Sequence, residues 1–243
     1  MRSLLFVRPD RKDIEAAVQS GADCLVFDLA EAAANPDMAA ARQRVLAGLH
    51  QARQNVRPAS LYVRVSSLPS ERVDADLDAV MSGLPDGIIL PKSQNGADVQ
   101  HLSVKLSVRE AEHGQSDGIT KIIAVVGETA AAIFEMGGYR GASRRLAGLI
   151  YGGAELGSAL GIAACERPDG TLAAPFAMAR SLTLFAAKAA NVAAIDAATS
   201  SDIDEASLRR GCEAAKRDGF SAKLALHPGQ VALINAVFAE KRF

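Results

Sequence analysis

Residues 87–92, GIILPK, and residues 121–126, KIIAVV, are two short runs in which nearly every side chain is apolar. A strand with one face in water alternates apolar and polar residues, whereas a strand covered on both faces is apolar throughout. The residues between the two runs have the spacing of a helix. This order of strand, helix and strand is typical of a parallel sheet.

The same alternation continues outward from these runs to both ends of the chain. Strands are expected at residues 3–7, 24–29, 60–65, 87–92, 121–127, 146–152, 191–197 and 222–226, with a helical segment in each gap and at the end. Units repeated in this way without a linker favour closure of the sheet, because closure leaves no open edge. We therefore predict an α/β fold with one (β/α)8 TIM-barrel domain over residues 1–243. An open, doubly wound sheet is the alternative.

Composition narrows the class of protein. A hydrophobic content of 49% suffices for a large core, and a net charge of −1 with dispersed Lys and Arg predicts no nucleic-acid partner. The most apolar later stretch, 172–198, contains charged residues, so we expect no membrane span. The cysteines form no CxxC pair and indicate a reduced, cytoplasmic protein without a zinc site. They are Cys24, Cys165 and Cys212.

Polar residues end most of the expected strands. In a barrel of this type, side chains at the C-terminal ends of the strands surround the mouth, where active sites lie. Charges at the ends of buried strands need an ion partner, hydrogen bonds or a metal. The set therefore predicts either a functional site or a ring of ion pairs. Its members are Asp28, Arg64, Lys92, Glu128, Glu155, Asp196 and His227.

Glu128 and Glu155 follow neighbouring strands, with no Lys or Arg close to them in the sequence. Two adjacent carboxylates repel each other unless one is protonated or a cation lies between them. Oxygen ligands of this kind suit Mg²⁺. Glu155 has a second interpretation, in which it only stabilises the first turn of the following helix.

Arg64 has a forked set of donors that suits the carboxylate of a substrate. A purely structural Arg would pair with a neighbouring acid such as Asp28, and we favour the substrate role. His227 precedes Pro228 at the start of the last helix, where we expect it to act as a structural residue. No Ser-His-Asp or Cys-His set is evident.

Several motifs, in a fixed order, carry a resemblance to a known family. They are RSLLFV at 2–7, GADCLVFDLAEA at 21–32, YVRV at 62–65, GIILPK at 87–92, GET at 127–129, YGGAELGSALG at 151–161, AIDA at 194–197 and DGFSAKLALHPGQVALIN at 218–235. Through them the chain resembles the citrate lyase β-subunit-like branch of the HpcH/HpaI aldolase and citrate lyase family. The resemblance covers nearly the whole chain.

The resemblance implies a barrel that assembles into trimers or multiples of trimers and binds Mg²⁺. It also implies an enzyme, a carbon-carbon lyase of the oxo-acid lyase type. Such an enzyme makes or breaks a carbon-carbon bond in a CoA thioester, such as citryl-CoA or malyl-CoA, with a 2-oxo acid as the other product. The partners expected are therefore a 2-oxo acid and a CoA thioester.

Carried over by motif, the resemblance gives each position a role. Arg64 holds the carboxylate of the oxo acid and, with Asp28 and Glu31, forms the catalytic set. Glu128 and Glu155 are the metal ligands. The glycine-rich motifs add three residues to the substrate-binding set, which are Gly127, Gly153 and Ala154.

The sequence departs from the family pattern in several places, including the first strand, which reads FVRPD where relatives commonly have FVPG. Glu155 stands where the family has Asp, and Ala30 stands where it has Glu. A further departure is at Phe243, where the chain ends and many relatives continue into a C-terminal lid, so we expect neither the lid nor steps that need it, such as thioester hydrolysis. The general base is not identified by sequence.

Two alternatives to the CoA lyase stay open. One is an aldolase that acts on free hydroxy-oxo acids, and the other is a non-catalytic protein that binds an oxo acid or a CoA ester. Basic residues that would meet the phosphates of CoA are present without being diagnostic. They are Arg8, Arg11, Arg140, Arg144 and Arg145.

Overall fold

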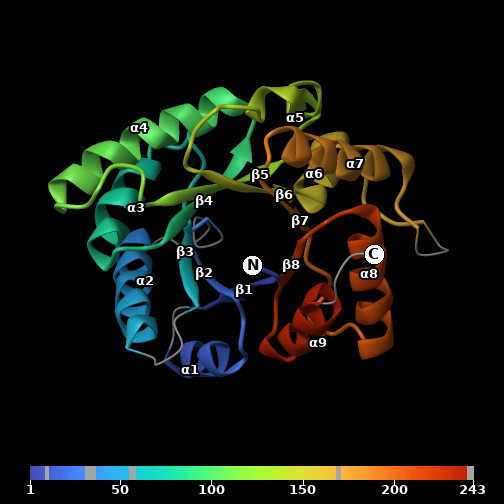
Figure 1. Cartoon of the computed structure of the whole chain (residues 1–243), viewed down its shortest axis with the longest axis horizontal. Helices are drawn as coiled ribbons and strands as arrows, with labels where there is room; N and C mark the ends of the chain where they lie inside the picture. Colours follow the sequence, from blue (N-terminus) through green and yellow to red (C-terminus); the bar gives the residue numbers. More distant parts are fainter. Residues whose placement is uncertain (9–10, 31–36, 55–58, 168–170, 240–243) are drawn as a thin grey trace.

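The computed structural model describes residues 1–8, 11–30, 37–54, 59–167 and 171–239. Parallel strands form a closed barrel in the order β1 to β8, with β1 paired to both β2 and β8 (Figure 1). The strands are β1 (Ser3–Val7), β2 (Cys24–Asp28), β3 (Ser60–Arg64), β4 (Gly87–Ser93), β5 (Lys121–Val126), β6 (Leu146–Tyr151), β7 (Ala193–Asp196) and β8 (Ala222–Ala225). The predicted TIM barrel is confirmed, with strand ends shifted by at most two residues.

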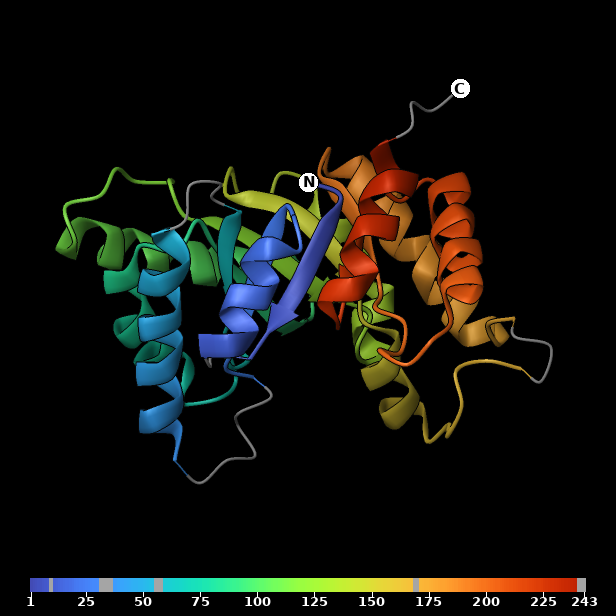
Figure 2. The same cartoon turned by 90° about the horizontal axis from the view of Figure 1, so that it is seen from below.

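Helices surround the barrel on its outer side (Figures 1 and 2). They are α1 (Arg11–Gln19), α2 (Met38–Arg53), α3 (Val73–Val80), α4 (Gly96–Glu112), α5 (Ala130–Phe134), α6 (Gly153–Leu160), α7 (Ala174–Ala189), α8 (Glu205–Asp218) and α9 (Pro228–Ala239), with short 3₁₀ turns η2 (Met81–Gly83) and η3 (Met136–Tyr139). Several helices begin at a side chain that accepts a main-chain N–H, such as Asn95 before α4 and Thr129 before α5. In the described part of the chain, no helix has both the length and the apolar character that crossing a membrane requires.

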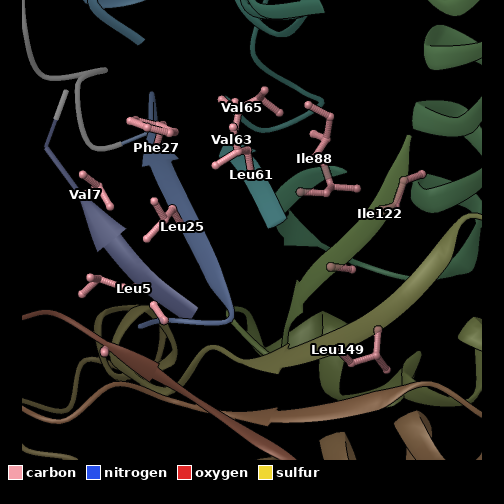
Figure 3. Packing of buried hydrophobic residues seen from close by; sticks show 14 of the residues in the cluster. Leu5, Val7, Leu25, Phe27, Leu61, Val63, Val65, Ile88, Ile122 and Leu149 are labelled. Carbon is pink, nitrogen blue, oxygen red and sulfur yellow. The ribbon is translucent and has the colours of Figure 1, made fainter. Parts of the chain in front are cut away.

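Alternate residues of each strand face opposite sides, which gives the molecule two cores. In β2, Cys24 and Val26 belong to the cluster inside the barrel, whereas Leu25 and Phe27 belong to the larger cluster beneath the helices. Figure 3 shows members of this outer cluster on neighbouring strands. A side chain within a regular strand therefore faces the inside of the barrel only if it belongs to the inner set, whereas a turn or bulge at the strand end can redirect the residues that follow.

The N-terminal end of the barrel is held by a buried ion pair. Arg145, 1% exposed, donates to both oxygens of Glu110, at 2.6 and 2.7 Å, and Glu110 also accepts the main-chain N–H groups of Gly118 and Thr120. Burial opposes the ionisation of Glu110, but Arg145 and these N–H groups outweigh it and lower its pKa to about 2. This network ties α4 to the start of β5 and β6.

The position of this network corrects one sequence-based expectation. Arg144 and Arg145 lie just before the start of β6, at the end of the barrel opposite the mouth. Arg145 is enclosed by its carboxylate partners, and Arg144 pairs with Asp117. These arginines are therefore not placed to meet the phosphates of a CoA bound at the mouth. Arg8 follows β1 and lies on the mouth side.

Candidate active site

Asp28 and Arg64 lie side by side at the ends of β2 and β3, on the inner face of the strands. Arg64 Nε donates to Asp28 Oδ1 at 2.9 Å, and its terminal Nη2 donates to Oδ2. The guanidinium also lies over the ring of Phe6, 4.8 Å from its centroid. The pairing that the sequence offered as an alternative is thus present, and 26% of the Arg64 side chain is still exposed.

Glu128 is a buried carboxylate at the end of β5. Gly127 precedes it with a φ of 73°, a conformation that suits glycine and turns the chain at the strand end. The side chain of Glu128 is buried and accepts the main-chain N–H of Lys92. Burial, and then the charge of Glu155, outweigh this hydrogen bond and raise the pKa of Glu128 to about 7.

Two glycines let the next loop approach Glu128. A Cβ atom on Gly152 would lie 2.3 Å from Glu128 Cγ, and one on Gly153 would lie 2.5 Å from the hydroxyl of Tyr151. The chain then enters α6, whose first turn contains Glu155. Close packing beside Glu128 therefore requires glycine at position 152.

Lys92 brings a positive charge to the two carboxylates. The register between β4 and β5 shifts between Leu90 and Ser93, and Lys92 within this bulge has a φ of 54°. Its ammonium lies 3.8 Å from Glu155 Oε2. The sequence marks Lys92 by its position at a strand end but gives it no role, because no pattern shows that β4 delivers it to Glu155.

The carboxylates suit a hard divalent cation. Among the described residues, no three His, Cys, Asp or Glu side chains gather into a metal-binding group. Mg²⁺ needs fewer protein ligands, because it is commonly held by one or two carboxylates, with water and a substrate completing its shell. A buried carboxylate whose pKa is raised in part by a second carboxylate gains from such a cation. Glu128 and Glu155 therefore fit Mg²⁺.

Asp196 takes the second interpretation of the strand-end residues, an ion pair, and does not join this site. It continues the outer face of β7, where Ala194 packs beneath the helices. Its carboxylate pairs with Arg180 of α7 and Lys223 of β8, each at 2.8 Å. Burial opposes the ionisation of Asp196, but these cations keep its pKa low. The cluster joins strands to helices.

His227 has the structural role expected of it. Its Nδ1 accepts the main-chain N–H of Gly229 at 3.1 Å, at the start of α9. It also borders an open cavity of about 470 Å³ between α8 and α9, on the outer side of the barrel. The main-chain N–H of His227 is bound by the buried side chain of Gln230. His227 therefore serves the helix start.

The structure brings most of the predicted site residues to one mouth. Asp28, Arg64, Glu128 and Glu155 come from the units of β2, β3, β5 and β6, and β4 between them supplies Lys92. Both Arg64 and Lys92 lower the pKa of Glu128 by their charge. Gly127, Gly153 and Ala154 adjoin the metal-binding candidates. Ala30 donates its main-chain N–H to Asp28 Oδ1 at 2.9 Å. Glu31 lies outside the described residues.

Known proteins share this sequence pattern along nearly the whole chain. Residues 2–228 match the family HpcH/HpaI aldolase/citrate lyase. The (3S)-malyl-CoA thioesterase of Cereibacter sphaeroides is 30% identical over 246 residues, covering 98% of this chain and 77% of that protein. Citrate lyase subunit beta of Escherichia coli is 31% identical over 244 residues, covering 98% of this chain and 76% of that protein.

Solved structures share the barrel. The citrate lyase beta subunit of Mycobacterium tuberculosis, complexed with oxaloacetate and magnesium, has a TM-score of 0.79 at 24% identity and covers 98% of this chain and 96% of its own. CitE of the same organism, in complex with magnesium, acetoacetate and coenzyme A, has a TM-score of 0.78 at 22% identity, covering 99% of this chain and 82% of its own. The family match and the related sequences lead to one conclusion: the chain belongs to the HpcH/HpaI aldolase/citrate lyase family.

Proposed function

We propose that the protein is a Mg²⁺-dependent carbon-carbon lyase of the oxo-acid lyase type. It cleaves or forms a 3-hydroxyacyl-CoA, of the citryl-CoA or malyl-CoA type, with an acyl-CoA and a 2-oxo acid as the other reactants. The observation that carries the proposal is the buried carboxylate of Glu128, beside Glu155 at the mouth and within the electrostatic reach of Arg64. This arrangement suits a divalent cation together with an anionic substrate.

Arg64 binds the carboxylate of the 2-oxo acid in this proposal. Its hydrogen bonds to Asp28 fix the plane of the guanidinium, and a guanidinium has more N–H donors than Asp28 accepts. Arg64 is thus oriented before substrate arrives, which lowers the entropic cost of binding. Asp28 acts by positioning Arg64, and both follow the inner face of the barrel.

Glu128 and Glu155 would hold Mg²⁺, and the ion supplies Lewis-acid polarisation of the oxo-acid oxygen when it is bound. Glu128, which is buried, gives a fixed ligand, whereas Glu155, 55% exposed, is the adjustable one. The extra methylene of Glu relative to Asp would be accommodated because the side chain of Glu155 is exposed in the first turn of α6 and can change its rotamer. The substrate-binding role of Gly153 and Ala154 rests on main-chain N–H groups in the first turn of α6.

Two measurements in sequence test the function. Calorimetric titration with Mg²⁺ plus oxaloacetate or glyoxylate should show metal-dependent binding of the oxo acid. Addition of acetyl-CoA or propionyl-CoA should then give a 3-hydroxyacyl-CoA, detected by mass spectrometry. Glu128→Gln should lower metal affinity and turnover by at least about a hundredfold, because it removes the buried ligand. Glu112→Gln, the same change at an exposed position at the end of α4, should alter neither the metal affinity nor the turnover.

The results also separate the alternatives. Binding of the oxo acid without turnover of any CoA ester would favour a non-catalytic binding protein, and turnover of free hydroxy-oxo acids alone would favour an aldolase. Full activity of Glu128→Gln would contradict the ligand assignment. The thioesterase relative favours a second candidate function, hydrolysis of a malyl-CoA-type thioester. Release of free CoA thiol without a 2-oxo acid would identify that reaction.

The assembly is proposed as a trimer or a multiple of it, as the family resemblance implies. Sedimentation velocity of the purified protein measures this directly. A mass of one chain at all concentrations would contradict the proposal. The assembly matters for the site only if a neighbouring copy contributes to the mouth.

A further inference from the structure

Lys92 is the residue through which β4 touches both candidate metal ligands. Its main-chain N–H donates to Glu128, and its ammonium lies 3.8 Å from Glu155 Oε2. The bulge between Leu90 and Ser93 takes this N–H out of the strand ladder and makes it available to the carboxylate. One residue therefore contacts a buried acid through its backbone and an exposed acid through its side chain.

The backbone of Lys92 is held in place from several sides. Gln94 Nε2 donates to Lys92 O at 3.2 Å, and Gln94 Oε1 accepts from the hydroxyl of Thr129 at 3.0 Å. Tyr139 donates its hydroxyl to the main-chain oxygen of Ser93 at 3.1 Å. These hydrogen bonds fasten the end of β4 to η3 and to the loop that carries Glu128. They fix the backbone of Lys92 and leave its ammonium exposed.

The backbone conformation of Lys92 indicates that its side chain has a role of its own. A φ of 54° is unfavourable for residues other than glycine, so a position that served only through its main-chain N–H would accept glycine without strain. Lysine at this position supplies a charge on a flexible stem. The charge lies where two carboxylates repel each other, which is the place where a cation is needed.

We propose that Lys92 is a positioning residue whose ammonium serves as the resident counter-ion of Glu155 and is displaced when a divalent cation binds between Glu155 and Glu128. The proposal rests on the proposed function, because it takes the two carboxylates as the metal ligands. Both partners of the ion pair are more than half exposed, at 54% for Lys92 and 55% for Glu155. Such a pair is weak, so a doubly charged ion with direct oxygen ligands replaces it.

Removal of the Lys92 charge should increase the affinity for Mg²⁺. Lys92→Met keeps the main-chain N–H and the length of the side chain but loses the ammonium. It should bind Mg²⁺ about three to ten times more tightly than the unchanged protein at low ionic strength, and the difference should shrink as salt rises. Lys92→Arg should restore an affinity close to the original, because it restores the charge. A residue that only supported the fold would lower the affinity instead.

The test is calorimetric titration of each variant with Mg²⁺ alone, at low and high ionic strength, with urea unfolding as a check on folding. Lys121→Met is the matched control, because Lys121 begins β5 at the opposite end of the barrel. Mg²⁺ binding by Lys92→Met that equals or falls below that of the unchanged protein, or an equal gain in Lys121→Met, overturns the proposal. Failure of the unchanged protein to bind Mg²⁺ in either condition would overturn the proposed function as well.

Discussion

Glu128 combines a charge with burial, and this makes its ionisation a measurable property of the folded protein. Its pKa is raised to about 7 by burial and by Glu155, above its ordinary value of about 4.5. Between about pH 4.5 and pH 7, Glu128 therefore carries a proton in the folded protein but has lost it in the unfolded chain. The free energy of unfolding of the metal-free protein should fall as pH rises through this window.

Glu128→Gln tests this at the residue scale. Glutamine has no proton to lose, so the variant should be more stable than the unchanged protein above about pH 7, by up to about 3 kcal/mol, and similar to it near about pH 5. Urea unfolding in the presence of a chelator measures both. Glu155→Gln keeps Glu128 ionisable and should move the pH dependence to lower pH. Identical pH profiles for Glu128→Gln and the unchanged protein would contradict the assignment.

Three residues at strand ends show what the sequence predicts about the site and what it does not. Arg64 and Glu128 were predicted because each ends an apolar strand, and position along the chain suffices for that. Asp196 satisfies the same rule but takes the other interpretation of the strand-end set, an ion pair, because it continues the outer face of β7 and pairs with Arg180 and Lys223. The face is set by the pleat and register of the finished sheet, which strand-end position alone does not give.

At the scale of elements, the start of α6 is as important as the residues it presents. Gly152 lets β6 and α6 pass close to Glu128, since a Cβ at this position would lie 2.3 Å from Glu128 Cγ. The sequence shows a Gly-Gly turn there but not the carboxylate beside it, because the contact joins separate strands. The sequence assigns no role to Lys92 for the same reason, because its partner Glu155 follows a different strand of the barrel.

Gly152→Ala should therefore displace Glu128. We expect a loss of about 1–3 kcal/mol in the free energy of unfolding from overpacking, together with weaker Mg²⁺ binding. Gly211→Ala is the control, because no atom lies within 4 Å of a Cβ placed there and α8 should gain about 0.5–1 kcal/mol from the better helix former. Urea unfolding and calorimetry measure the two effects. Unchanged Mg²⁺ affinity in Gly152→Ala would mean that the glycine does not set the ligand position.

At the scale of the whole molecule, the two ends of the barrel have different tasks. The mouth holds the two carboxylates Glu128 and Glu155, which repel each other, whereas the opposite end holds the enclosed pair of Glu110 and Arg145. The barrel itself was predictable because eight apolar strands with intervening helices have few other ways to bury their faces. The fully buried pair was not, because nothing in the sequence distinguishes Arg145 from its exposed neighbour Arg144.

Glu110→Gln should destabilise the protein without affecting the mouth. It leaves the guanidinium of Arg145 buried with less compensation, which costs about 3–5 kcal/mol. The pKa of Glu110 is lowered to about 2, so the contribution of its charge to the free energy of unfolding is lost as the pH falls from about 4.5 toward 2. Glu110→Gln has no such charge, so the free energy of unfolding of this variant should fall less steeply over that pH range. Urea unfolding across acidic pH measures both. A change in Mg²⁺ affinity of the folded variant would show that the two ends are coupled.

The seam between β1 and β8 ties the earliest part of the chain to the latest. Ser3 pairs with Lys223 in the sheet, and its hydroxyl donates to Asn235, which lies 232 positions further along the chain. During synthesis on the ribosome, β1 therefore has no second neighbour until β8 has emerged. An open edge of this kind can pair with other strands of the same type. The nascent chain is thus most prone to misassembly before β8 leaves the ribosome. Slow translation of the segment that precedes β8 would lengthen this period, although the finished barrel has no open edge.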